Sequence, residues 1–418
     1  MATFDLVALL LSLAAALSWI NFKLLRLPHE IGLVVTGLAV SLLLVAARHL
    51  LPGWWNDAPV AAMLSHVDFT DVVLNGVLAF LIFAGALTLD LQALRRRAFT
   101  VATLAVVGTA VSTAVVGVAF WEAARLVGHP MSFAWALVFG ALISPTDPVA
   151  VVSTLKHVAI PSVIETEMQG EALFNDGVGI VIFTVLVGYA SGRGDLGPGG
   201  IALDFLREAG GGIALGLVFG YAAYRAMRSL DHYQTEVLIT LGLVAGTYSV
   251  AQALGASGPL AVVAAGLLIG EKAPQDAMSD RTSSYVTKLW TLIEDVLNSV
   301  LFLLMGLEMA EVSFGASAVL LALAAVPCVL LGRLAAVSLP IPFRSDIPRA
   351  LRNLPFLTWA GVRGAISVAL ALALPEGGPK SAILAATYAV VIFTVVVQGS
   401  TLKPLARRTL ERPKGEAA

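Results

Sequence analysis

Long apolar runs of about 20 residues recur along the whole sequence, and they restrict the possible fold more than any other feature. A helix needs about 20 residues to cross roughly 30 Å of hydrocarbon, whereas the strands of a transmembrane barrel would appear as short alternating segments. Hydrophobic residues make up 58% of the chain and charged residues 13%, unlike a soluble domain. The sequence therefore predicts an all-α polytopic membrane protein. Thirteen transmembrane helices are expected at about 5–22, 31–51, 71–90, 99–121, 132–154, 170–190, 201–224, 234–254, 257–271, 289–310, 315–338, 354–374 and 381–402.

The connections between these runs alternate in charge. Nineteen Lys and Arg residues lie in one set of connections and five in the other, with the remaining two inside runs. Cytoplasmic loops carry the excess of positive charge. We therefore expect a multi-pass protein of the cell membrane, with the N-terminus outside and the C-terminus in the cytoplasm.

Thirteen helices with opposite-facing ends suit two inverted six-helix repeats joined by one helix. Helix 5 then corresponds to helix 12, which contains WAGVRGAISVAL with Gly361, Arg363 and Gly364 near its middle. Paired interruptions of this kind indicate two broken helices, 5 and 12, that cross at a midplane binding site. Arg363 could compensate negative charge at this site, neutralise the C-terminus of a half-helix, or extend to water.

The interruption of helix 5 lies in ALISPTDPVAVV, residues 141–152. Pro145 and Pro148 remove two backbone donors, so Asp147 can cap a second half-helix with Pro148 at its first position. Half-helix ends, freed carbonyls such as that of Thr146, and two carboxylates from neighbouring helices would form an oxygen-rich cage. Such a cage suits a hard monovalent cation, and protons compete for the same carboxylates.

Charged side chains inside a bilayer cost on the order of 2.5–3.5 kcal/mol each and need a partner or a purpose. Glu171, near the cytoplasmic start of helix 6, and Arg333, near the cytoplasmic end of helix 11, are expected to form a buried ion pair. Asn175 shares a helical face with Glu171 and would be a hydrogen-bonding neighbour. Asp176 is then left without a basic partner on its face. Partial desolvation favours its neutral form, so Asp176 could carry either a proton or a cation.

Several motifs occur in order on these helices: SPTDPVAVVSTL, GEALFNDGVGIVIF, the pair Gly332-Arg333 and GVRGAISVALAL. With them the sequence resembles the monovalent cation:proton antiporters, in the branch of bacterial NhaP-like proteins and animal sodium/proton exchangers. The resemblance covers nearly the whole chain, and the combination of motifs is far more specific than any one of them.

The resemblance implies roles for individual residues. Asp176 would be the carboxylate of the transported cation and the proton, Asp147 and Thr146 would belong to the broken-helix part of the site, and Glu171, Asn175 and Arg333 would form a structural polar network. It also implies a homodimer and, because helix 6 carries Asn-Asp, electroneutral one-for-one exchange. The implied organisation is dimerisation-domain helices at 1–98 and 234–310, core-domain helices at 99–190 and 311–402, a linking helix at 191–233 and a cytoplasmic tail at 403–418.

Ala172 and Ala84 depart from the pattern, because many relatives carry a hydroxyl at the first position and some carry a carboxylate at the second. The cation is therefore open among Na⁺, Li⁺ and K⁺. The leading function is secondary antiport of Na⁺ against H⁺, with K⁺/H⁺ antiport as the alternative. An intramembrane aspartyl hydrolase using Asp147 and Asp176, and a cation channel, are the competing classes. No cofactor and no nucleic acid are expected; the partners are membrane lipid, monovalent cations and protons.

Overall fold

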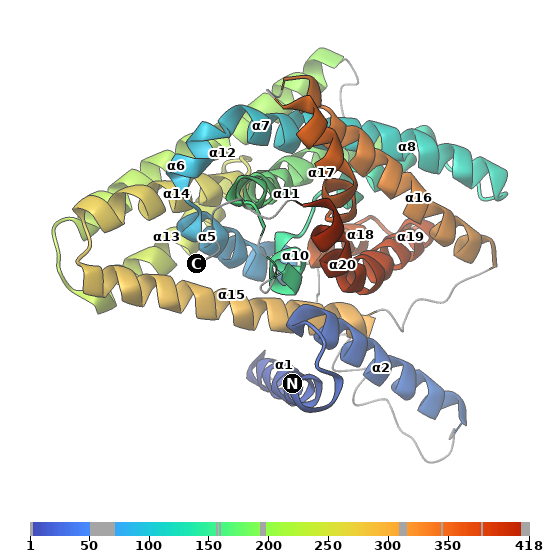
Figure 1. Ribbon diagram of the computed structural model, residues 1–418, viewed down its shortest axis with the longest axis horizontal. Helices are drawn as coiled ribbons and strands as arrows, with labels where there is room; N and C mark the ends of the chain where they lie inside the picture. The colour runs from blue at the N-terminus through green and yellow to red at the C-terminus, as the bar shows by residue number, and fades with distance from the viewer. Residues whose placement is uncertain are drawn as a thin grey trace.

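The computed structural model of the protein describes residues 3–50, 72–155, 158, 160–192, 198–308, 316–343, 346–377 and 379–410, and all its elements over these residues are helices (Figure 1). The first part contains α1 (Thr3–Ile20), η1 (Asn21–Leu25), α2 (His29–Leu50), η2 (Val72–Val77), α5 (Leu78–Thr88), α6 (Leu91–Arg96), α7 (Ala98–Ala102), η3 (Thr103–Gly108) and α8 (Thr109–Leu126). The middle contains α9 (Phe133–Ile143), α10 (Pro148–Leu155), α11 (Ser162–Ala190), α12 (Pro198–Met227), α13 (Tyr233–Ala253), α14 (Gly258–Asp276) and α15 (Asp280–Glu308). The last part contains α16 (Ala316–Ser338), η4 (Ile341–Phe343), α17 (Ile347–Trp359), α18 (Ala365–Leu372), α19 (Lys380–Ile392), η5 (Phe393–Gln398) and α20 (Gly399–Thr409).

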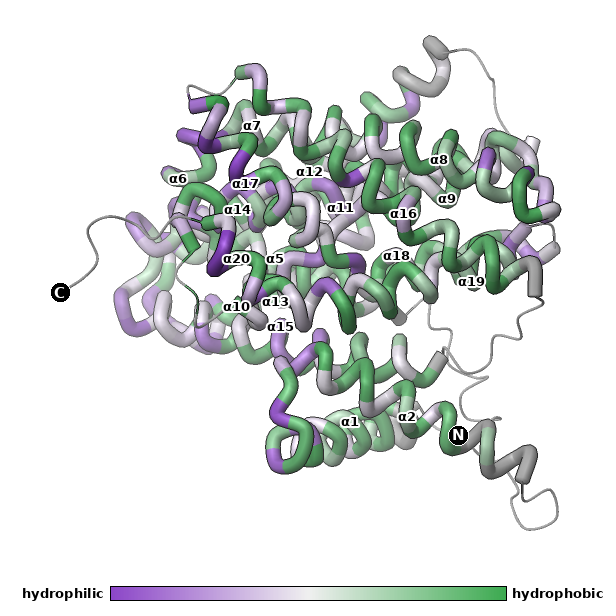
Figure 2. The backbone as a smooth tube through the Cα atoms, turned by 45° about the vertical axis from the view of Figure 1, so that its right-hand side comes forward, coloured by the Kyte–Doolittle hydropathy of each residue, from purple (hydrophilic) through white to green (hydrophobic). Residues whose placement is uncertain are grey.

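Each of the thirteen predicted segments falls on one or more of these helices. Apolar residues run along most of them (Figure 2). Seven helices of the described part are long and apolar enough to cross a membrane: Val7–Leu25, Ala98–Leu126, Ser162–Ala190, Tyr233–Ala253, Asp280–Leu307, Ala318–Phe343 and Lys380–Thr409. The all-helical, multi-pass architecture is therefore confirmed, while the number of thirteen spans stays a prediction.

Several helices extend beyond the apolar runs that predicted them. α11 begins at Ser162, eight residues before the predicted start, so Glu171 lies about 14 Å along the helix rather than near its beginning. The extension is polar, and a hydropathy pattern does not report it. α20 likewise continues to Thr409, into the segment predicted as a tail, and residues 411–418 of that tail lie outside the described part.

The segment predicted as a linking helix forms one of the closest helix pairs in the structure. Three glycines of α12 at four-residue spacing, Gly212, Gly216 and Gly220, face small residues of α14 and its N-cap. A Cβ added at Gly216 would lie 2.8 Å from the carbonyl carbon of Ala261. Small residues at this spacing let two helix backbones approach closely, which is how helices associate in lipid. α12 is therefore packed into the bundle along α14.

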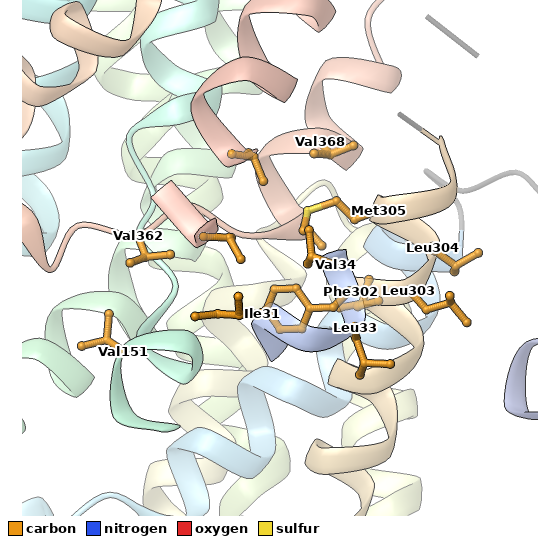
Figure 3. Close-up of a cluster of buried hydrophobic side chains, with 14 of the residues drawn as sticks. Ile31, Leu33, Val34, Val151, Phe302, Leu303, Leu304, Met305, Val362 and Val368 are labelled. Carbon is orange, nitrogen blue, oxygen red and sulfur yellow. The ribbon is translucent and has the colours of Figure 1, made fainter. Parts of the chain in front are cut away.

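Three apolar clusters fill the interior. One joins α5 with α12, α13, α14 and α15, and it also includes Leu173 of α11. A second joins α8, α9, α11, α16, α18 and α19. The third lies where α2 and α15 meet the helices around the two breaks, and it includes Val34, Phe302, Val151 and Val362 (Figure 3). α1 and most of α2 lie beside α15 at the edge of the bundle (Figure 1), while the start of α2 reaches the helices at the breaks.

We expect Gly216→Val to lower the free energy of unfolding by about 1–3 kcal/mol, because the added side chain overpacks the α12–α14 contact. The measurement is the thermal unfolding of the purified protein in detergent. Gly210→Val is the matched control, since Gly210 lies on the same helix with no neighbouring atom within 4 Å of an added Cβ. Equal melting temperatures for the two variants would contradict the close packing of this pair.

Candidate functional site

The two predicted interruptions are present, and they touch. α9 ends at Ile143 and α10 begins at Pro148, while α17 ends at Trp359 and α18 begins at Ala365. The backbone N–H of Asp147 donates a hydrogen bond to the carbonyl of Val362 at 2.8 Å. The break in one half of the chain is thus hydrogen-bonded to the break in the other.

Gly364 makes this approach possible. A Cβ at Gly364 would lie 2.5 Å from a carboxylate oxygen of Asp147 and 3.0 Å from its Cβ. Any other residue would push the Asp147 side chain away from the second break. Asp147 itself occupies the position just before α10, as the proline pattern predicted.

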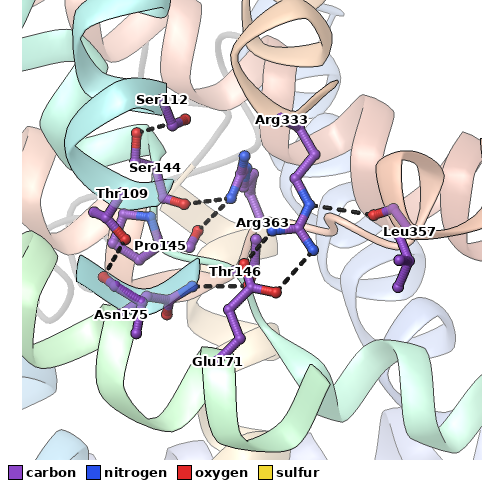
Figure 4. A network of polar contacts seen from close by, with 11 residues as sticks. Thr109, Ser112, Ser144, Pro145, Thr146, Glu171, Asn175, Arg333, Leu357 and Arg363 are labelled. Carbon is purple, nitrogen blue, oxygen red and sulfur yellow. Dashed lines mark hydrogen bonds and ion pairs between the residues drawn. The ribbon is translucent and has the colours of Figure 1, made fainter. Parts of the chain in front are cut away.

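Arg363 joins the two breaks through its side chain. Its Nη1 donates to the carbonyls of Ser144 and Pro145, at 2.6 Å and 2.9 Å (Figure 4). In a continuous helix the Ser144 carbonyl would accept from residue 148, but Pro148 has no N–H. The guanidinium therefore satisfies carbonyls that the break leaves without helical partners. The side chain is 0% exposed, so of the three roles considered for Arg363, extension to water does not fit its position.

Hydroxyl groups hold the end of α9 in place. The Ser144 Oγ donates to Gly140 O, lies 2.9 Å from Ser112 Oγ of α8, and is within reach of Thr113. Thr394 of η5 accepts from the backbone N–H of Arg363 at 3.1 Å. The sequence did not single out these residues, because isolated Ser and Thr in apolar helices commonly bond their own preceding turn and leave no distinctive pattern.

Glu171 and Arg333 form the expected ion pair. Arg333 Nη1 bonds Glu171 Oε1, and Nη2 bonds Oε2 at 3.1 Å, so the pair is bidentate. Both side chains are buried. The Nε of Arg333 also donates to the carbonyl of Leu357 at 3.2 Å, and its aliphatic stem lies against Gly361. One arginine thus ties α16 to α11 and to α17.

Asn175 bonds across to the break rather than to the ion pair. Its Nδ2 donates to the Thr146 Oγ1 at 3.0 Å, and both residues are buried (Figure 4). Its Oδ1 is buried and has no hydrogen-bond partner among the described residues. The prediction that Asn175 is a neighbour of Glu171 and Arg333 is therefore incomplete: it shares their region, but its hydrogen bond leads to Thr146.

Asp147 and Asp176 come together at this junction. Asp147 follows Thr146 in the break and Asp176 follows Asn175 in α11, and the two carboxylates are close enough to interact electrostatically. Both side chains are partly exposed, unlike Thr146 and Asn175. Within the described part of the chain, no group of three His, Cys, Asp or Glu residues could hold a metal ion.

Comparison with known proteins identifies the family of the chain. A family described as "Sodium/hydrogen exchanger, transmembrane" matches residues 9–408. The Na(+)/H(+) antiporter NhaP of Pseudomonas aeruginosa is 39% identical over 410 residues, covering 97% of this chain and 96% of that protein. The Na(+)/H(+) antiporter NhaH of Halobacillus dabanensis is 34% identical over 407 residues, covering 96% and 97%. The structure of the sodium proton antiporter MjNhaP1 from Methanocaldococcus jannaschii at pH 8 is 19% identical and shares the fold, with a TM-score of 0.77 over 99% of this chain and all of that chain. The chain therefore belongs to the transmembrane sodium/hydrogen exchanger family.

Proposed function

We propose that the protein exchanges Na⁺ for H⁺ across the membrane, with Asp176 as the group for which the two ions compete. The observation that carries the proposal is the pair of carboxylates, Asp147 and Asp176, at the contact between two broken helices. Proteins of this family are transporters rather than enzymes, and the similar proteins from P. aeruginosa and H. dabanensis are Na(+)/H(+) antiporters. This membership favours exchange over the hydrolase considered from the sequence.

The chemistry of the junction suits a monovalent cation. Two carboxylates that are close together repel each other when both are ionised, and a bound cation or proton relieves that repulsion. Asn175 Oδ1 and Thr146 contribute neutral oxygen at the same place, and Oδ1 has no hydrogen-bond partner among the described residues. Hard cations prefer such oxygen ligands. Na⁺ and H⁺ are the cargo of this site.

In this proposal Arg363 and the Glu171–Arg333 pair have a structural role: they stabilise the site and do not carry transported charge. Arg363 supplies positive charge at the C-terminal end of α9, where the helix dipole is negative. Arg333 is neutralised by Glu171, and a satisfied ion pair is a poor carrier of transported charge.

Potassium is the alternative cargo. Ala172 is buried next to Glu171, and Ala84 is fully buried in α5; neither offers a side-chain oxygen. Fewer oxygen ligands weaken the discrimination between cations. Proton flux measured in reconstituted vesicles with Na⁺, Li⁺ and K⁺ added in turn separates the two cargoes.

The proposal includes thirteen spans in two inverted repeats, an external N-terminus, a cytoplasmic C-terminus and a homodimer with alternating access. Two of the three apolar clusters support a division into a group with α5 and α12–α15 and a group with α8, α9, α11, α16, α18 and α19. The packing of α12 along α14 supports placing the linking helix in the first group.

Asp176→Asn is expected to reduce Na⁺-driven proton movement to the background of protein-free vesicles, because it removes the group that binds both ions. The measurement is proton flux in proteoliposomes, with melting temperature as a check on folding. Asp204→Asn, which neutralises an exposed carboxylate of α12, is the matched control and should retain exchange. Exchange near the wild-type rate in Asp176→Asn would refute the assignment.

Arg333→Ala is expected to destabilise the protein by about 3–5 kcal/mol, because Glu171 would be left as an uncompensated buried charge. Replacing both partners by neutral residues of similar size should recover part of the loss. Arg125→Ala breaks an exposed pair with Glu122 and should cost about 0–1 kcal/mol. Thermal unfolding in detergent measures all three; similar losses for Arg333→Ala and Arg125→Ala would count against a structural role of the buried pair.

Transport is expected to be electroneutral, because one carboxylate alternates between one proton and one monovalent cation. At low pH, protons occupy this carboxylate and exclude Na⁺, so the transport rate should fall. Raising the Na⁺ concentration should move this fall to lower pH, since the two ions compete for one group. The test imposes a membrane potential on proteoliposomes at fixed ion gradients and follows Na⁺ uptake. A rate that rises steeply with potential would show that a second charge moves and that Asp147 or Arg363 belongs to the transported set.

A further inference from the structure

The turn between α1 and α2 is held in one conformation by a buried amide. Asn21 is 3% exposed; its Nδ2 donates to the carbonyl of Leu27 at 3.1 Å, and its Oδ1 accepts from the N–H of Leu27 at 3.3 Å. The backbone N–H of Arg26 donates to Asn21 O at 2.7 Å. Gly32 lies directly against the amide, where no Cβ would fit. The buried amide therefore ties the two ends of the turn together.

An open pocket of about 510 Å³ lies at this turn. Its polar lining consists of Ser18, Asn21, Lys23, Arg26 and His29, and two apolar residues complete it. Among the described residues, neither Lys23 nor Arg26 forms an ion pair, and both are exposed. The pocket thus holds two positive charges that no carboxylate of the described residues pairs with.

The backbone of Arg26 is in the left-handed conformation at the C-terminal cap of η1. Its φ is 55°, and it is the only residue other than glycine in the described part of the chain with a positive φ. Glycine adopts this conformation without strain, whereas a side chain with a Cβ does not. A glycine would therefore serve the turn better than arginine does. Residues other than glycine in such conformations are concentrated at functional and ligand-binding sites.

The surroundings of the pocket are apolar and exposed. Trp19, near the end of α1, and Phe22 and Leu24, in η1, are 63%, 77% and 73% exposed. Aromatic residues next to Lys and Arg mark the boundary between hydrocarbon and water, where the cationic heads reach toward the polar layer. A ligand bound here would meet positive charge at one end and hydrocarbon at the other.

We propose that this pocket binds a phosphate group, supplied by an anionic phospholipid of the membrane. Arg26 and Lys23 suit a phosphate because guanidinium and ammonium groups form charge-assisted hydrogen bonds to its oxygens. The Ser18 hydroxyl adds a neutral donor. The exposed aromatic and aliphatic side chains would contact the acyl chains, which a free phosphate lacks.

The test titrates the purified full-length protein in detergent with phosphatidylglycerol, phosphatidylcholine or inorganic phosphate and follows the melting temperature. Only phosphatidylglycerol is expected to raise it saturably. The variants are Lys23→Gln, Arg26→Gly and the two combined. Each single change should raise the half-saturating lipid concentration about fivefold and the pair about 25-fold. Arg26→Gly should fold normally, because glycine relieves the strained φ.

The matched control is the double change Arg96→Gln with Arg97→Gln, which removes two exposed charges from another turn. It should leave the half-saturating concentration within about twofold of wild type. If the control pair raised the half-saturating lipid concentration as much as the pocket pair, the effect would be one of general surface charge, and the proposed binding site would be wrong. An equal response to phosphatidylcholine would also overturn it. If inorganic phosphate alone reproduces the shift and displaces the lipid, the source is a soluble phosphate and the lipid assignment is wrong.

Discussion

Backbone polar groups inside a bilayer must find partners within the protein, and this requirement explains why the two helix breaks occur together. Breaking the helix at residues 144–147 removes the helical partner of the Ser144 carbonyl, and Arg363 from the other break replaces it. The Asp147 N–H, in turn, finds its acceptor at Val362. Each break therefore provides hydrogen-bond partners for backbone groups that lack a helical partner in the other break. Gly364 keeps them in contact, because a larger residue would meet the Asp147 carboxylate.

The same arrangement determines which groups the two buried arginines bind. The hydrogen bonds of Arg333 go to Glu171 and to the Leu357 carbonyl, and those of the Arg363 side chain go to two carbonyls of the α9 end. Neither guanidinium is hydrogen-bonded to Asp176. The buried positive charges thus stabilise the frame, while the carboxylates at its edge stay partly exposed. A fixed cation bonded to Asp176 would compete with a mobile one, so this separation supports a site that binds and releases its ion.

Charged residues and prolines inside apolar runs were visible in the sequence because a bilayer makes them costly, and this is why Asp147, Glu171 and Arg333 could be found there. Sequence spacing also predicted which residues share a face of one helix, but it did not predict which residues of other helices lie opposite that face. Asn175 shares a face with Glu171, yet its amide bonds Thr146 on another helix. The carbonyls bound by Arg363 could not be predicted for the same reason. The polar first turns of α11 were missed because hydropathy detects the bilayer core and does not detect the helix that continues beyond it.

The third apolar cluster differs in kind from the polar junction beside it. Hydrogen bonds and the ion pair connect α8, α9, α11, α16, α17 and η5 to one another around the breaks. α2 and α15 meet the helices at the breaks in an apolar cluster. Val34 of α2 and Phe302 and Met305 of α15 form one side of it, and Val151 and Val362 form the other. Apolar contacts have no preferred direction, so they can be rearranged without leaving a buried polar group unpaired. Directional bonds, in contrast, hold their partners at fixed geometry. A junction that is rigid within itself and bordered by an apolar surface can move as one body, and this physical difference supports the proposed alternating access.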